Sequence, residues 1–96
     1  MFFIYILYSE LADKYYVGQT DDVTRRLIEH NELSENSFTS KYRPWTLMAK
    51  YAVGNSRGVA LKIEKHIKKQ KSRNYIESII KRNSIEILIK RFRSAG

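Results

Sequence analysis

The chain has 96 residues, of which 43% are hydrophobic, and a formal net charge of +8. This length is enough for one small core but not for two, so we expect residues 1–96 to form a single domain. The absence of cysteine excludes disulfides, thiolate chemistry and zinc fingers, and it makes a reducing, cytoplasmic setting the expected one. The positive charge favours polyanionic partners, nucleic acid first among them, although solubility alone would also explain it.

Two strands are predicted at the start of the chain. Residues 2–8 are a run of aromatic and β-branched side chains, and residues 15–20 form a second run after a short polar connection. Such a connection favours an antiparallel hairpin. Residues 1–8 are too few to span a bilayer and lack the basic start of a signal peptide, so we expect a protein that does not enter membranes.

A helix is predicted directly after the hairpin. The two acids at positions 21–22 can cap its N-terminus, and Val23, Leu27 and His30 recur at helical spacing. Asn31 is the expected end of this helix. A polar segment and the chain's only proline follow, and residues 45–53 then predict a third strand.

The second half of the chain is predicted to be mostly helical. The apolar face of the next helix, which Ser56 can cap, consists of Val59, Ala60, Ile63 and Ile67. The spacing over residues 75–80 predicts another helix and that over residues 85–92 a last one, where the alternation of Ile85, Ile87 and Ile89 leaves a strand as the alternative. The order ββαβαα, followed by this last element, indicates an α+β fold with a small three-stranded antiparallel sheet packed with helices.

Positive charge collects in the C-terminal part of the chain. Residues 1–56 carry six basic and seven acidic side chains, whereas residues 57–96 carry twelve and three. The predicted nucleic-acid-binding side chains are Arg57, Lys62, Lys65, Lys68, Lys69, Lys71 and Arg73. We expect them to hold phosphates without reading bases, because no segment resembles a recognition helix, and sequence specificity should therefore be low.

Four side chains could together support hydrolysis of a phosphodiester. The reaction needs an in-line nucleophile, positive charge at the nonbridging oxygens and help for the leaving oxygen. Tyr5 and Tyr16 lie on the two predicted strands, Arg26 on the helix after them, and Glu64 among the lysines of a later helix. Each also has an ordinary explanation, which is core packing for the tyrosines and a helix ion pair for Arg26 and Glu64.

The order and spacing of these residues resemble the GIY-YIG nuclease family. Phe3-Ile4-Tyr5 and Tyr16-Val17-Gly18 correspond to its two triplets, with Gly18 as the motif glycine, and the tyrosines are eleven residues apart. Arg26 follows Gly18 by eight residues, and Glu64 lies in the helix where the family keeps its metal-binding glutamate. The resemblance covers roughly residues 2–70 and indicates the same α+β fold.

The resemblance is closest to the small standalone bacterial branch of the family. That branch is similar to the catalytic N-terminal domain of the excision-repair endonuclease, and Arg43-Pro44-Trp45 is typical of it. Two residues depart from the pattern: Phe3 stands at the first glycine, and Gln19 stands where the excision-repair relatives have lysine. The alternatives are therefore a nucleic-acid-binding module of the same fold with weak or no cleavage, and a nuclease that needs a protein partner for targeting.

The resemblance implies a metal-dependent DNA endonuclease that uses one Mg²⁺ or Mn²⁺ ion bound by Glu64. Tyr5 or Tyr16 would orient or deprotonate the attacking water, and Arg26 would stabilise the transition state. A free tyrosine has a pKa near 10, so its use as a base at neutral pH needs nearby positive charge. Activation of the water by the metal, with a tyrosine only positioning it, is the competing assignment.

His30 is a further candidate for the same site. It lies one helical turn beyond Arg26 and could touch the same phosphate or donate to the leaving group, or it could have a structural role. DNA repair or recombination intermediates are the expected substrates because of the excision-repair resemblance. We expect no small-molecule substrate, since the sequence has neither zinc-ligand spacing nor a glycine-rich phosphate loop.

Overall fold

The sheet is the centre of the molecule. The computed structural model of the chain describes residues 1–33 and 38–94. Three strands, β1 (Phe2–Ser9), β2 (Lys14–Thr20) and β3 (Thr46–Gly54), form an antiparallel sheet in the order β2–β1–β3. The predicted α+β class and the predicted hairpin are therefore confirmed, and β1 is the central strand with a neighbour on each side.

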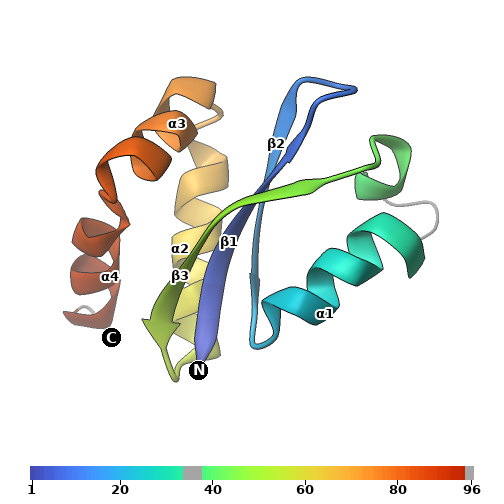
Figure 1. Cartoon of the computed structure of the whole chain (residues 1–96). Helices are drawn as coiled ribbons and strands as arrows, with labels where there is room; N and C mark the ends of the chain where they lie inside the picture. Colours follow the sequence, from blue (N-terminus) through green and yellow to red (C-terminus); the bar gives the residue numbers. More distant parts are fainter. Residues whose placement is uncertain (34–37, 95–96) are drawn as a thin grey trace.

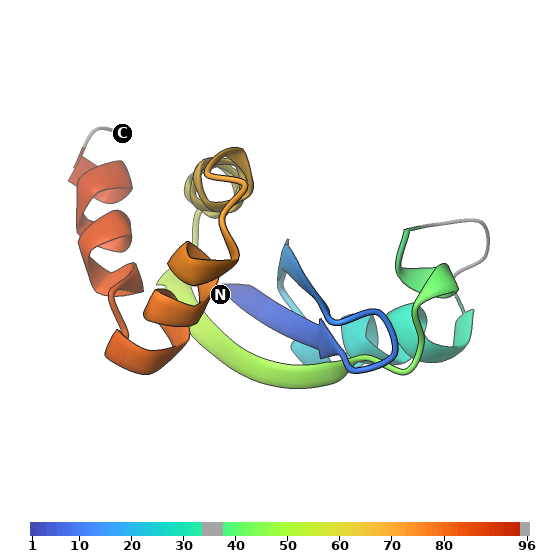
Figure 2. The same ribbon diagram turned by 90° about the horizontal axis from the view of Figure 1, so that it is seen from above.

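Helices cover both faces of this sheet. The helical elements are α1 (Val23–Ile28), the π-helical turn η1 (Glu29–Leu33), the 3₁₀ turn η2 (Thr39–Lys41), α2 (Arg57–Lys69), α3 (Arg73–Arg82) and α4 (Ile85–Ser94). Figures 1 and 2 show α1 on one side of the strands and α2, α3 and α4 on the other. In the part of the chain that the structure describes, no helix combines the length and the apolar character needed to cross a membrane.

Side-chain caps explain where three of the helices begin. Asp22, Ser56 and Ser72 each accept a hydrogen bond from the backbone N–H three residues further on, at 3.0, 3.2 and 3.1 Å, at the starts of α1, α2 and α3. The helix predicted over residues 23–31 differs from the expectation, because it is α-helical only to Ile28 and then widens into η1. Single π-helical turns of this kind often occur at functional sites.

The last element is a helix, so the strand alternative for residues 85–92 was wrong. Asn83 ends α3 in the left-handed conformation (φ 52°), and α4 begins two residues later. In α4, Ile85 and Leu88 are buried and Ile87 is 70% exposed. This i, i+3 burial is the helical pattern, whereas a strand would place residues 85 and 87 on the same face.

Strand β1 sends its side chains alternately into two separate cores. Ile4 and Ile6 join the core formed with α2, α3 and α4, while Tyr5 and Leu7 join a second cluster on the α1 side. All four are at most 1% exposed. Because side chains in a strand alternate with a period of two, this central strand supports both layers of helices.

A β-bulge lets strand β3 contribute to both cores as well. Ile6 pairs with Ala49 but Leu7 pairs with Leu47, so Met48 is an extra residue on β3. Leu47 consequently packs on the α1 side, although Val53, six positions away, is buried on the other. Without the bulge the alternation would place both on one face.

The core between the sheet and α2 should dominate stability. Ile63 is completely buried there, so Ile63→Ala should lower the free energy of unfolding by about 2–5 kcal/mol through lost contacts and a residual cavity. Urea denaturation measures this change. The control is Ile87→Ala, which removes the same atoms from an exposed position and should change stability by less than about 0.5 kcal/mol. Equal effects of the two substitutions would contradict the assignment of the core.

Candidate active site

A buried chain of hydrogen bonds connects strand β1 with the segment after α1. The Tyr5 hydroxyl lies 2.8 Å from His30 Nε2, and His30 Nδ1 lies 2.8 Å from Thr39 Oγ1. Tyr5 is 1% and His30 2% exposed, so both ring nitrogens are occupied by protein groups inside the α1-side layer. The structure thus brings His30 to Tyr5.

Gly18 makes room for the Tyr5 ring. The two residues are cross-strand partners on β1 and β2, and a Cβ atom at Gly18 would lie 2.3 Å from the Tyr5 hydroxyl oxygen. Any side chain at this position would push the phenol away from His30. The motif glycine is therefore required by a close approach of a side chain.

Tyr16 lies at the outer edge of the same cluster and is only partly buried. Its ring centroid is 6.4 Å from that of Tyr5 and 4.9 Å from that of His30. The Lys68 Nζ atom lies over the Tyr16 ring, 4.8 Å from its centroid. Of the two tyrosines Tyr5 and Tyr16, Tyr16 is therefore the one that solvent can reach, and the Lys68 ammonium lies beside it.

Glu64 comes to the site around the edge of the sheet. Neighbouring α2 residues pack on the sheet face opposite to Tyr5, yet Glu64 Oε1 accepts a 2.8 Å hydrogen bond from Lys68, the lysine that lies over Tyr16. Glu64 also contributes to raising the pKa of Tyr5, so its charge acts on the phenol. The carboxylate is 19% exposed and can still meet a ligand from solvent.

Arg26 presents its guanidinium at the rim of the site. Its Nη1 atom donates a 2.7 Å hydrogen bond to Glu29 Oε2, and its side chain remains 32% exposed. The guanidinium acts on the Tyr5 hydroxyl from close by, since it favours the ionised phenol. Two tyrosines, an arginine and a glutamate that are distant in the sequence therefore converge.

Burial determines the protonation of the two central groups. It raises the pKa of Tyr5 to about 12, because desolvation outweighs the nearby Arg26 charge. It lowers the pKa of His30 to about 4, and the positive charge of Arg26 adds to this effect. At neutral pH the site therefore contains a neutral phenol hydrogen-bonded to a neutral imidazole.

Residues that were not predicted to belong to the site hold His30 in place. Arg43 Nε donates a 2.7 Å hydrogen bond to the His30 carbonyl oxygen. Asn31 pairs with the Trp45 backbone through both atoms of its amide, at 2.6 and 3.0 Å. Arg43 belongs to the Arg43-Pro44-Trp45 triplet and Asn31 was the predicted helix end, but neither was predicted to support the site. Thr39 lies in a polar segment that has no periodicity, so no sequence signal pointed to it.

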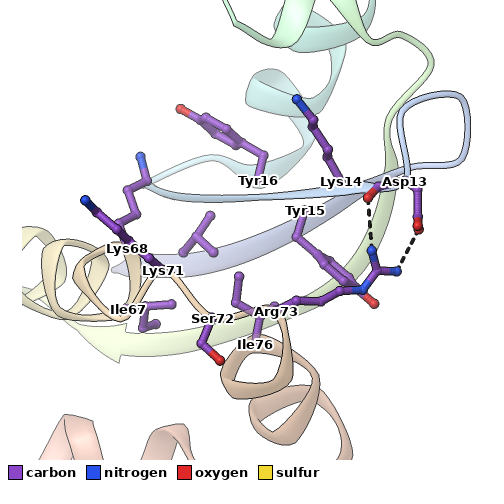
Figure 3. A pocket seen from close by; sticks show the side chains of 11 residues that line it. Asp13, Lys14, Tyr15, Tyr16, Ile67, Lys68, Lys71, Ser72, Arg73 and Ile76 are labelled. Carbon is purple, nitrogen blue, oxygen red and sulfur yellow. Dashed lines mark hydrogen bonds and ion pairs between the residues drawn. The ribbon is translucent and has the colours of Figure 1, made fainter.

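The predicted nucleic-acid-binding residues divide into groups. Lys68, Lys71 and Arg73 border a cavity beside β2, which Figure 3 shows. Lys62, Lys65 and Lys69 recur at i, i+3 and i+7 on α2 and share a solvent face that begins roughly 100° around the helix from Glu64. Arg57, at the start of α2, lies 4.7 Å from the centre of the Phe2 ring.

A comparison with known families matches residues 1–77 to the GIY-YIG catalytic domain, and the chain therefore belongs to the GIY-YIG nuclease family. No curated protein matches the chain significantly. GIY-YIG nucleases generally use divalent metal ions and act on DNA.

One departure from the family pattern has a structural explanation and the other has none. Phe3, at the position of the first motif glycine, packs against the α1-side cluster that contains Tyr5 and adds apolar surface to it. Gln19 has its side-chain carbonyl oxygen buried with no hydrogen-bond partner among the described residues. Nothing in the structure explains the glutamine.

The donor set fits a single hydrated divalent ion. Among residues 1–33 and 38–94, no group of three or more His, Cys, Asp or Glu side chains is placed to enclose a metal. Mg²⁺ commonly binds through one or two carboxylates and completes its shell with water and substrate phosphate. Glu64, partly exposed beside Tyr16 and Lys68, can serve as that one carboxylate.

Gly18→Ala should disturb the site and the fold together. The added methyl group overlaps the Tyr5 ring, so the free energy of unfolding should fall by about 1–3 kcal/mol. Gly58→Ala is the control, because Gly58 is in α2 with ordinary space around it, and alanine should stabilise the helix by about 0.5–1 kcal/mol. Urea unfolding of both proteins checks the opposite signs.

His30 should make the protein less stable in acid. Because folding lowers the His30 pKa from 6.5 to about 4, the unfolded chain takes up a proton in this window that the folded chain does not. The contribution of His30 to the free energy of unfolding should therefore be fully present above about pH 7. It should decrease by up to about 3 kcal/mol as the pH falls to about 4, and stay constant below that pH.

The measurement is urea unfolding across this pH range for the wild type and His30→Asn. In His30→Asn, the free energy of unfolding should no longer show the decrease that His30 causes between about pH 7 and about pH 4. In His66→Asn this decrease should remain. An unchanged slope in His30→Asn would show that the buried imidazole titrates normally.

Proposed function

We propose that this protein is a metal-dependent endonuclease that hydrolyses phosphodiester bonds in DNA. The observation that carries the proposal is the convergence of Tyr5, Tyr16, Arg26 and Glu64 around one partly open site. Their side chains supply the chemistry that hydrolysis requires, namely groups that orient water, a cation for the nonbridging oxygens and a carboxylate for a metal.

Arg26 is proposed to bind the scissile phosphate and to stabilise the charge that grows on it. Its partner Glu29 holds the guanidinium at the rim through a partly exposed ion pair, which a phosphate can replace at little cost. A bidentate guanidinium contact to phosphate also fixes the orientation of the ester.

Tyr5 is proposed to act as a neutral hydrogen-bonding group. Burial raises its pKa to about 12, so it keeps its proton at neutral pH and does not serve as the base in the protein described here. When His30 Nε2 carries its proton, it donates to the Tyr5 oxygen and leaves the phenol hydrogen for another acceptor. Because Tyr5 is 1% exposed, the bound DNA must open the site before its phosphate or the attacking water can be that acceptor. Thr39 can adapt, because a hydroxyl both donates and accepts.

Tyr16 and His30 are proposed to have different roles. Tyr16 is partly exposed beside the Lys68 ammonium, so it can orient the attacking water directly. His30 is 2% exposed with both nitrogens hydrogen-bonded, so it acts through Tyr5 and does not touch the phosphate. A divalent cation bound at Glu64, Mg²⁺ or Mn²⁺, would supply positive charge to the phosphate and the attacking water.

The substrate is proposed to be a DNA intermediate of repair or recombination, cleaved with low sequence specificity. Lys68 and Lys71 lie where they can contact backbone phosphates, and the lysines on the outer face of α2 add a positive field. No base-reading helix is present among the described elements, which supports low specificity. A cytoplasmic location is proposed from the cysteine-free sequence, and a protein partner could supply targeting.

The proposal predicts metal-dependent nicking of plasmid DNA. With Mn²⁺ or Mg²⁺ the wild type should nick, and EDTA should stop it. Arg26→Ala should slow nicking by about 10²–10³-fold, since it removes a charge that stabilises the transition state, and Glu64→Gln should reduce it to background. A plasmid relaxation assay measures these rates.

Neighbouring residues provide matched controls. Arg25→Ala removes the adjacent, more exposed guanidinium, and Glu86→Gln neutralises a carboxylate on α4, so both should nick at near the wild-type rate. Salt-sensitive binding without nicking would instead support a nucleic-acid-binding module. Equal nicking by the wild type and all variants would indicate a contaminant.

A further inference from the structure

A cavity of about 340 Å³ lies beside the proposed active site and has no role in the mechanism above. It opens between edge strand β2 and the turn that joins α2 to α3 (Figure 3). Tyr16 and Lys68 belong to its lining and also to the active site, so the two spaces share a wall. Whatever occupies the cavity is therefore next to the scissile phosphate.

The walls of the cavity are apolar. Val17 of β2 and Ile67 of α2 line it together with Ile76 of α3. The Tyr15 ring lies along the strand side. Tyr15 is held there by a hydrogen bond to Glu77 and by the Arg73 guanidinium over its ring. A flat, mainly apolar group can enter between the strand and the helices.

The rim of the cavity is positively charged. Four basic residues border it and one acidic residue, Asp13, which Arg73 already pairs with. The Lys14 ammonium lies over the Tyr42 ring on the other face of the sheet, whereas Lys71 has no ion-pair partner among the described residues. An apolar slot with cations at its mouth is complementary to a nucleotide, whose base is flat and whose phosphate is anionic.

Lys71 has an unusual backbone conformation. It stands just after α2 in the left-handed conformation, with φ 49°, where glycine or asparagine is usual. A lysine there is strained, and strain of this kind is characteristic of positions kept for function. Its side chain lies at the mouth of the cavity.

We propose that this cavity is a subsite for one unstacked nucleotide of the bound DNA strand, adjacent to the scissile phosphate. The base would enter the cavity against Ile76, and Lys71 at its mouth would bind a flanking phosphate. This inference rests on the proposed nuclease function and extends it to the form of the substrate. A strand with an unpaired nucleotide at this point fits the subsite, whereas a fully stacked duplex must first release a base.

The test is binding in EDTA, so that no cleavage is needed. The probe is a single-stranded oligonucleotide with one 2-aminopurine, whose fluorescence increases when the base leaves the stack. Ile76→Trp fills the slot from α3 and should weaken binding by about tenfold and abolish the fluorescence increase, since one stacked base is lost. Ile80→Trp, one turn further along α3, is the matched control and should leave both readouts unchanged.

Lys71→Gly separates binding from folding. Glycine suits the left-handed position, so the melting temperature should stay the same or rise, while oligonucleotide binding weakens by about fivefold or more through the lost phosphate contact. Asn83→Gly makes the equivalent change at the end of α3, away from the cavity, and should leave binding unchanged.

Each outcome decides the proposal. Unchanged binding and fluorescence in a folded Ile76→Trp protein, or in Lys71→Gly, would overturn it. Displacement of the probe by micromolar free deoxyadenosine monophosphate would overturn it in favour of a site for free nucleotides. Because the assay needs no nicking, a failed nicking experiment would refute the proposed nuclease function, whereas unchanged binding in these variants would refute the subsite alone. The two failures are therefore distinguishable.

Discussion

The contact between the Tyr5 phenol and His30 sets the conditions for the rest of the site. A buried hydroxyl needs a hydrogen-bond partner, since leaving it unpaired costs roughly 1–3 kcal/mol. Tyr5 is on the central strand and can reach His30 only because Gly18 has no side chain beneath the ring. His30 in turn must remain neutral, and the widened turn after α1 holds it there with a hydrogen bond from Arg43. One buried contact thus connects the sheet, α1 and the segment before β3.

Charge in the site is arranged from a neutral interior to a charged rim. Tyr5 and His30 are neutral inside, while Arg26 and Glu64 lie further out. The outer charges are paired with neighbours on their own helical segments, Arg26 with Glu29 and Glu64 with Lys68. Such partly exposed pairs contribute little stability, so their exchange for a phosphate or a metal requires little free energy. The protein can therefore keep its cations and its carboxylate close together before substrate binds.

The sheet edge beside α2 is where the site and the cavity meet. Strand β2 has a neighbour on one side only, and Lys68 of α2 reaches the Tyr16 ring around this open edge. This geometry gives two adjoining spaces with a shared wall of one aromatic and one cationic side chain. Figure 3 shows Lys68, Lys71 and Arg73 on the helical side of the cavity. A DNA strand that follows this edge would meet phosphate-binding and base-binding groups in succession.

By itself, the sequence determined the α+β class, the strands, the capped starts of α1 and α2, and the spacing of Tyr5, Tyr16, Gly18 and Arg26. Periodicity, caps and local motifs depend on near neighbours along the chain. It did not place Glu64 and Lys68 beside Tyr16, nor explain why position 18 must be glycine. It also missed the π-helical turn and Thr39. These depend on residues brought together from different elements, and only tertiary packing decides which side chains are buried, which pKa values shift and which charges meet at one edge of the sheet.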